Sequence, residues 1–418
     1  MSQEPGLRRA MGGFDATTVG IGAMIGAGAF VVFAPASASA GALLPLAVVI
    51  AGFIAYCNAS ATASLAVRYP TSGGTYVYGR EQLGPWPGFL AGWAFVTGKL
   101  ASCAAMALTF GLYAAPGAEK AAGVAAVVGL TLVNLLGVTR TALATRVIVS
   151  LVVPVLAFVV VVAFASPAAS GPAAADSEGA VGVLQAAALL FFAFAGYARI
   201  ATMGEEVREP RRNIPAAIFG ALGFTLLLYL LLALSLLHAF GPTRLAGTTA
   251  PLREVFDAST PGAAAGVGGG VITLAAALAS LGALLALIAG VGRTSLAMAR
   301  GGDLPRVLSR ISARYSVPWV ADIVTAVVVV VLLLATDVLT VVGFSSFGVL
   351  LYYAIANIAA FTLTERQWYS PRWLNTVGAA GCLVLAFTLP ATSVLTMLGV
   401  LAVGLIVRAV VLARRRAV

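Results

Sequence analysis

The stretch Val19–Phe30, VGIGAMIGAGAF, sets four glycines inside a long apolar run: Gly20, Gly22, Gly26 and Gly28. Each glycine weakens a helix interior by roughly 1 kcal/mol relative to alanine. A helix that is interrupted within a membrane frees backbone N–H and C=O groups, which is tolerated only beside a water-filled cavity or a polar ligand. The run therefore predicts a broken spanning helix whose backbone binds a polar group.

A second interrupted segment, FFAFAGYARIATMGEE, covers residues 191–206, and in it Gly196 follows a cluster of aromatic residues. A half-helix that begins near Ala27 would point its positive N-terminal end at the membrane centre, which suits a carboxylate. A half-helix that ends near Ala193 would offer free carbonyls, which suit an ammonium group. Together the two breaks fit a zwitterion. The alternative is that the glycines only let helices pack closely.

Lys99 is the outstanding charge within the apolar segments, near the middle of GWAFVTGKLASCAAMALTF. A lysine at the centre of a membrane costs at least about 2.5–3.5 kcal/mol. We interpret Lys99 as a candidate for coupling transport to an ion, either by gaining and losing a proton or as a fixed cation. A purely structural lysine, bound by carbonyls or reaching the surface through a cavity, is the alternative.

Charged residues also gather at the end of the second interrupted segment. Glu205 and Glu206 lie there, facing a loop that contains Arg80, and Arg293 could join them. A charged inner gate is one interpretation, and a solvated surface is the other, since exposed ion pairs contribute little stability. Arg199, seven residues before Glu206, either extends to the inner surface or lines an inward vestibule.

The elements that must position these residues are membrane-spanning helices. Of the 418 residues, 61% are hydrophobic and 10% are charged, against about 25% charged in soluble domains. Apolar runs of about 20 residues, enough to cross the hydrocarbon core, recur along the whole chain. We therefore expect an all-α polytopic membrane protein with 12 transmembrane helices, approximately at residues 14–40, 42–66, 86–114, 121–138, 144–165, 182–206, 214–239, 270–299, 318–336, 339–363, 374–390 and 392–411.

Basic residues predict the orientation. With the N-terminus inside, 18 of the 25 Lys and Arg residues fall on the cytoplasmic side and three on the other, a bias that places both termini in the cytoplasm. Residues 1–13 and 412–418 are then cytoplasmic tails of a protein in the cytoplasmic (inner) membrane. The same bias explains the net charge of +10 without nucleic acid as a partner. On the outer side, a short surface helix is expected around Leu252–Ala258.

Four motifs resemble those of the amino acid–polyamine–organocation (APC) transporter family over residues 14–363. They are IGAGAF at 25–30, YPTSGGTYVYGREQLG at 69–84, FFAFAGYARIATMGEEVREPRRNIPAAI at 191–218 and AMARGGDLPRVLSRIS at 297–312. The third is similar to the cationic amino acid transporter branch and its bacterial relatives. The resemblance implies a LeuT-like fold: two inverted five-helix repeats with helices 1 and 6 broken, forming a transport core at 14–363, followed by helices 11–12 at 364–411.

The resemblance also implies where the substrate binds. Its carboxylate would meet backbone amides of Gly26, Ala27 and Gly28, and its amino group would meet carbonyls of both broken helices. Phe192 takes the place of an aromatic gate, and Ala27 replaces a serine of some members. The substrate-binding residues are therefore expected to be Met24, Ile25, Gly26, Ala27, Gly28, Phe192, Ala193, Phe194, Ala195 and Gly196.

The substrate is expected to be a neutral L-amino acid, taken up with protons by alternating access. Members of the cationic branch often have an acidic residue at the position of Ala198, and its absence argues against a cationic substrate. Some proton-coupled members of the family have a lysine in the fifth span. The position aligned with it here is Val152, so this lysine is absent. Exchange, export and cationic amino acid transport remain alternatives.

Other classes of protein fit the sequence less well. A membrane enzyme would need a catalytic set, but the chain has one histidine, His238, at the outer end of the seventh span with no cluster around it. No metal-ligand spacing or phosphate-binding loop is present, so no cofactor or metal is expected. The expected partners are an amino acid, protons and the lipid bilayer. An amino-acid sensor would use the same site and stays a non-transport alternative.

Overall fold

The computed structural model describes residues 11–71, 73–136, 141–169, 179–201, 203, 206–259 and 263–416. These residues form α-helices and short 3-10 turns, and strand pairing among them is limited to one isolated bridge between Met11 and Val207. In chain order, the helical elements are α1 (Gly13–Met24), α2 (Ala27–Val31), α3 (Phe33–Ala40), η1 (Gly41–Leu43), α4 (Leu44–Arg68), α5 (Thr75–Leu83), α6 (Pro85–Ala114), α7 (Glu119–Leu135), α8 (Thr141–Ala165), α9 (Gly179–Phe194), η3 (Ala195–Tyr197), α10 (Ala198–Ala201), α11 (Pro210–Ala246), α12 (Pro251–Ser259), α13 (Ala263–Arg300), η4 (Arg306–Ser309), α14 (Trp319–Ala335), α15 (Val338–Phe361), α16 (Arg372–Thr388) and α17 (Ala391–Arg416).

Nine helical segments among the described residues are long and apolar enough to cross a membrane, and α14 is a shorter apolar helix. The prediction of a multi-pass, all-helical membrane protein is thereby confirmed. The expected spans at 121–138 and 374–390 coincide with α7 and α16, which have 17 residues each. Twelve crossings remain a prediction, because these two helices and α14 are shorter than a usual span.

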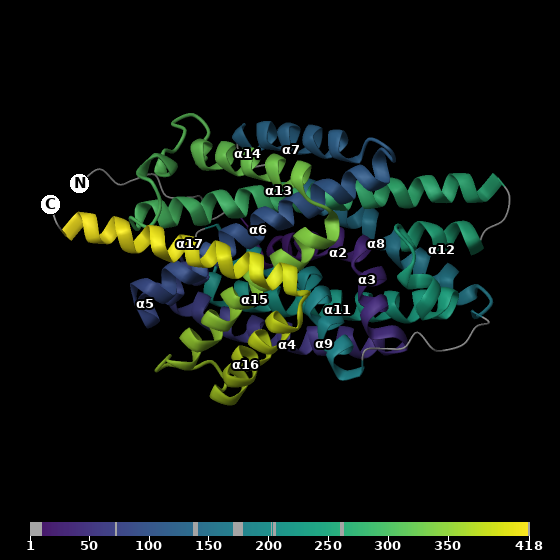
Figure 1. Ribbon diagram of the computed structural model, residues 1–418, viewed down its shortest axis with the longest axis horizontal. Helices are drawn as coiled ribbons and strands as arrows, with labels where there is room; N and C mark the ends of the chain where they lie inside the picture. Colours follow the sequence, from purple (N-terminus) through teal and green to yellow (C-terminus); the bar gives the residue numbers. More distant parts are fainter. Residues whose placement is uncertain are drawn as a thin grey trace.

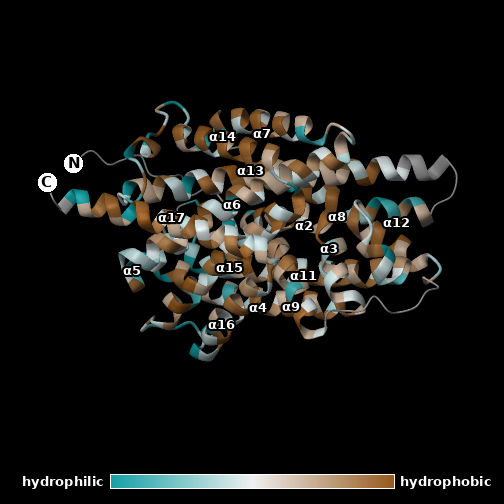
Figure 2. Ribbon diagram, in the orientation of Figure 1, coloured by the Kyte–Doolittle hydropathy of each residue, from teal (hydrophilic) through white to brown (hydrophobic). Residues whose placement is uncertain are grey.

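Most helices run along the long axis of the molecule, with the short helices α5 and α12 at opposite ends (Figure 1). Hydrophobic residues cover the middle of the helices and hydrophilic residues gather at the two ends (Figure 2). Large apolar side chains also face outward, among them Leu395, Val161 and Ile406, each more than 60% exposed. Such a surface suits acyl chains, which are as apolar as the side chains they touch.

The helix α12 coincides with the surface helix expected around Leu252–Ala258. It does not lie free on the surface, since Leu252, Val255 and Phe256 are buried. Its apolar face packs against α8 and α13.

Helix α6 lies at the centre of the bundle, against α13 on one side and α15 on another. Small residues permit this close approach. A Cβ on Gly348 of α15 would lie 2.8 Å from the carbonyl oxygen of Ala94, and a Cβ on Gly98 would lie 3.2 Å from that of Ser345. Glycine at such contacts lets two backbones meet. Lys99, the next residue of α6, is thus carried into the middle of the protein.

Candidate functional site

The first interruption of helical geometry lies at Ile25 and Gly26, between α1 and α2. Ile25 has φ/ψ of −80°/80° and Gly26 has −134°/−140°, well away from the helical values near −63°/−42°. Helix α2 then begins at Ala27 and directs its N-terminal amides back toward the break.

Side chains from two other helices bind the backbone groups that this break frees. The hydroxyl of Tyr229 in α11 donates to the carbonyl oxygen of Met24 at 2.7 Å. The amide N–H of Ala27 donates to the sulfur of Met106 in α6 at 3.0 Å. A thioether is a weak acceptor. The amide of Ala27 is thus bound to a group that a stronger acceptor, such as a carboxylate, can displace.

Two glycines at the break are required by close approach. A Cβ on Gly26 would lie 2.8 Å from the Met106 sulfur and 2.7 Å from the Cβ of Ala283. A Cβ on Gly28 would lie 2.6 Å from the Cα of Ala193 in α9. The second contact brings the two interrupted segments together, backbone against backbone.

The second interruption lies where the half-helix was expected to end, near Ala193, but it is a tight turn and not an unwound stretch. Helix α9 continues to Phe194, and the chain then tightens into the 3-10 turn η3 before α10. The reason is a tertiary contact: a Cβ on Gly196 would lie 2.5 Å from the backbone nitrogen of Met24. The turn is pressed against the end of α1, and the two interruptions meet there.

All ten residues expected to bind substrate lie close to this meeting point, on α1, α2, α9 and η3 and in the break between α1 and α2. All ten are buried, and the most exposed of the seven that are not glycine is Phe192 at 6%. The structure therefore brings together the residues that the two sequence segments suggested, and encloses them.

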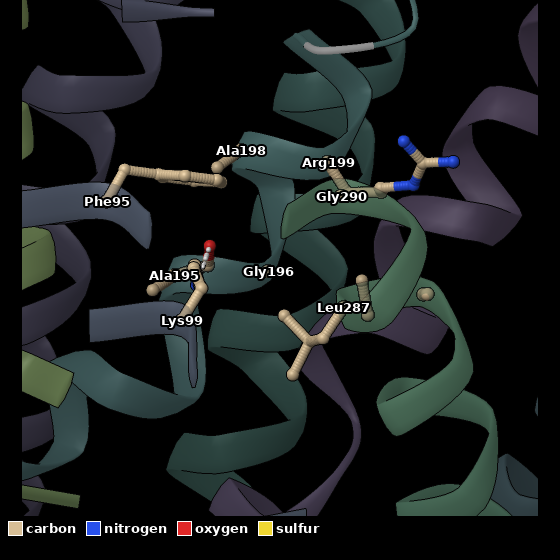
Figure 3. Close-up of a pocket in the computed structure, with 10 residues that line it drawn as sticks. Phe95, Lys99, Ala195, Gly196, Ala198, Arg199, Leu287 and Gly290 are labelled. Atoms are coloured by element: carbon tan, nitrogen blue, oxygen red, sulfur yellow. Dashed lines mark hydrogen bonds between the residues drawn. The ribbon is translucent and has the colours of Figure 1, made fainter. Parts of the chain in front are cut away.

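Lys99 reaches the same region from α6. Its ammonium group donates to the carbonyl oxygen of Ala195 at 3.2 Å, and 4% of the residue is exposed (Figure 3). A cavity of about 20 Å³ lies beside it, which is room for about one water molecule and too little for an amino acid. Ten residues line this cavity: Ala23, Phe95, Lys99, Ala195, Gly196, Ala198, Arg199, Ala286, Leu287 and Gly290.

Arg199 lines the cavity rather than reaching the surface, as it is 8% exposed. Its guanidinium group points away from Lys99 (Figure 3). Of the two alternatives considered for Arg199, lining an inner space agrees with this position. Together with Lys99 it gives the cavity two cationic residues and no acidic one.

The residues considered for an inner gate separate into two groups. Glu206 pairs with Arg293 of α13 at 2.8 Å, and both side chains are largely buried. Arg80 of α5 pairs instead with Asp303, just after α13, at 3.0 Å. Glu205 lies outside the described residues. Arg80 and Glu206 thus do not pair, because each has a nearer partner of opposite charge.

Asp303 is the centre of a buried charged cluster at the end of the molecule. Besides Arg80 it binds Arg408 of α17 at 2.9 Å and accepts a hydrogen bond from the hydroxyl of Tyr76 at 2.9 Å. Burial and the charge of Asp303 raise the pKa of Tyr76 to about 12. Tyr76 therefore stays a neutral donor at physiological pH.

Sequence reasoning overlooked Asp322 of α14 and Asn134 of α7. Asp322 is fully buried, and one of its oxygens accepts a hydrogen bond from the Asn134 amide at 2.8 Å. Hydropathy placed Asp322 near the beginning of the span at 318–336, and carboxylates are common at the ends of spans. The available signal was that Asp322 is the sole charged residue of WVADIVTAVVVVVLLLA.

Comparison with known proteins agrees with this architecture. The sequence pattern of the family described as amino acid permease matches residues 11–413. An uncharacterized transporter of Mycobacterium tuberculosis (strain ATCC 25618 / H37Rv) is 51% identical over 403 residues, covering 95% of this chain and 90% of the relative.

More distant relatives include transporters with named substrates. The branched-chain amino acid permease BcaP of Bacillus subtilis (strain 168) is 26% identical, over 97% of this chain and 93% of its own length. The chloroplastic cationic amino acid transporter 6 of Arabidopsis thaliana is 27% identical, over 85% of this chain and 66% of its own length.

Proposed function

Since this chain belongs to the amino acid permease family, we propose that it takes up neutral L-amino acids together with protons, by alternating access. Amino acid transport and a multi-pass membrane location follow from the family. The substrate class, the coupling ion and the direction are our proposal. The observation that carries it is the contact of two interrupted helices, Gly196 against Met24 and Gly28 against Ala193.

We propose that the amino acid binds at this contact through backbone groups. Its carboxylate would bind amides of Gly26, Ala27 and Gly28 at the N-terminus of α2, replacing the sulfur of Met106. Its ammonium group would bind carbonyls at Met24 and Ile25 and along Phe192–Ala195. Helix termini offer such unpaired groups with the matching partial charge.

The substrate is proposed to be neutral because of the charges around the cavity. Lys99 and Arg199 line it, and its lining residues include no carboxylate. In a site of low dielectric, two cations would repel a lysine or arginine side chain strongly. The branched-chain permease among the relatives agrees with an apolar side chain, whereas the cationic transporters keep the alternative open.

The small cavity requires that the protein move during transport. Room for about one water means that the surrounding helices must separate to admit an amino acid. We propose that α1, α2, α9 and α10 move against the rest, within a LeuT-like fold of 12 helices in two inverted five-helix repeats. The protein would then lie in the inner membrane with both termini in the cytoplasm.

Lys99 is proposed to act as a fixed cation in this mechanism. Its ammonium group holds the Ala195 carbonyl at 3.2 Å, and so fixes the turn that touches α1. A charge in this place ties α6 to the sixth-span turn without any bound metal ion. Of the two roles expected for Lys99, this one uses a contact that the side chain makes.

The test is uptake by purified protein in liposomes, with labelled alanine, leucine, lysine and arginine, with and without an inward proton gradient. Accumulation of alanine or leucine that requires the gradient is the expected result. Uptake only into liposomes preloaded with amino acid would instead indicate an exchanger. A preference for lysine or arginine would contradict the argument from Lys99 and Arg199, and binding without uptake would indicate a sensor.

A further inference from the structure

Asp322 is a buried carboxylate with an incomplete set of partners. It is 0% exposed, and its Oδ2 accepts one hydrogen bond from Asn134. Its Oδ1 is buried with no hydrogen-bond partner among the described residues. An ionised carboxylate in such a place is costly unless it is fully paired, whereas a protonated one is tolerated. Protonation of Asp322 would therefore relieve an electrostatic cost at this site.

The unpartnered oxygen faces the backbone of α13. It lies against Gly292, where a Cβ would collide with it. The next residue of α13 is Arg293, whose Nη1 binds Glu206 at 2.8 Å. Arg293 is thus paired with Glu206 at the end of the sixth segment, and it directly follows the glycine that lies against Asp322 of α14.

Other charged groups on the elements packed against α14 are accounted for elsewhere. The charged residues of α7, Glu119 and Lys120, lie about 14 residues before Asn134, which is about 21 Å along the helix. The ammonium group on α6 is bound to Ala195, and the remaining arginines are exposed. These groups are Glu119 and Lys120 of α7, Lys99 of α6, Arg300 of α13 and Arg306 of η4.

We propose that Asp322 is the proton-binding site of this transporter and acts on the inner gate through Arg293. With a proton on Asp322, Arg293 is attracted by Glu206 alone, and the Arg293–Glu206 pair holds the end of the sixth segment against α13. Loss of that proton creates a second carboxylate that competes for Arg293. The ion pair then weakens, so the inner end opens more readily than it does with the proton bound. This inference rests on the proposed proton-coupled uptake.

The experiment compares Asp322→Asn with wild type in liposomes, in two assays. An imposed gradient of one pH unit can drive about tenfold accumulation for one proton per substrate. Counterflow into preloaded liposomes needs the substrate site and the movement but no net proton transfer. Because Asp322→Asn cannot release a proton, it is expected to reduce the accumulation ratio from up to about ten to about one, and to keep counterflow at a reduced rate.

Glu365→Gln is the matched control, because it makes the same carboxylate-to-amide change at a side chain that is 85% exposed. It is expected to accumulate substrate like wild type. If wild type accumulates substrate in response to the proton gradient and Asp322→Asn does so equally, the role of Asp322 is overturned and the proposed function stands. Complete loss of counterflow in a correctly folded Asp322→Asn protein would assign Asp322 a structural role and also overturn the inference.

A second variant tests the site without removing the carboxylate. The Asn134 amide that donates to Oδ2 favours the ionised form of Asp322. Asn134→Ala removes this donor and so makes the proton harder to release. The pH profile of gradient-driven uptake should then shift upward by about one unit. An unshifted profile would contradict the proposal. Absence of gradient-driven uptake in wild type would instead refute proton coupling itself.

Discussion

At the scale of single residues, the site depends on which atoms hold the freed backbone groups before substrate arrives. The Ala27 amide is bound to a thioether and the Met24 carbonyl to a phenol. The first is a weak hydrogen bond and the second an ordinary one. In the proposed binding mode, a substrate carboxylate that replaces the Met106 sulfur would form a stronger hydrogen bond to the Ala27 amide and so favour binding at α2.

Replacing Met106 by leucine should tighten substrate binding. The change nearly conserves volume but leaves the Ala27 amide without an acceptor in the substrate-free protein. A lost hydrogen bond of about 0.5–1.5 kcal/mol in that state lowers the Kd about two- to tenfold. Isothermal titration of the detergent-solubilised protein with the substrate found by uptake measures it. Met298→Leu, at a buried methionine packed against Gly92, is the control, and an unchanged Kd in Met106→Leu would refute the displacement.

At the scale of elements, the two interruptions are set by different causes. The first coincides with glycines in the sequence, so its position could be predicted close to Gly26. The second is a 3-10 turn whose form depends on Gly196 being pressed against α1. Local sequence contains no information on that contact, so the position of the break near Ala193 could be predicted but the tight turn could not.

Gly28→Ala should separate α2 from α9 and reduce transport. The added methyl group would lie 2.6 Å from the Cα of Ala193, and such overpacking costs about 1–3 kcal/mol. We expect a lower melting temperature and uptake slowed by roughly five- to 150-fold, since 1.4 kcal/mol corresponds to a factor of ten. Gly129→Ala on α7, where a Cβ meets no atom within 4 Å, should keep both values. Normal uptake in Gly28→Ala would show that this contact is not needed.

At the scale of the whole molecule, composition alone predicted an all-helical membrane protein, because apolar runs of spanning length dominate the chain. Which acidic residue each arginine pairs with could not be predicted from the sequence. Arg80 and Glu206 were both expected at the inner end, yet Arg80 binds Asp303 and Glu206 binds Arg293. Those pairings depend on how α5, α13 and α17 are arranged in space. A hydropathy profile orders the helices along the chain and leaves their neighbours undetermined.

The Asp303 cluster connects the last helix to the core, and its removal should destabilise the whole protein. Asp303→Asn would leave Arg80 and the buried Arg408 close together without a counter-charge. Loss of one partner from a buried ion pair costs about 3–5 kcal/mol. The exposed Arg68–Glu365 pair, whose nearest atoms are 3.9 Å apart, should contribute at most about 1 kcal/mol.

Melting temperatures of Asp303→Asn and Glu365→Gln in one detergent test this directly. The first should fall by many degrees and the second should stay near wild type, because the two variants make the same chemical change in buried and exposed surroundings. Tyr76→Phe removes only the phenol that donates to Asp303 and should lie between them. Equal shifts for the two carboxylate variants would mean that α17 is held by apolar packing alone, and the two arginines would then have to be neutralised by another group.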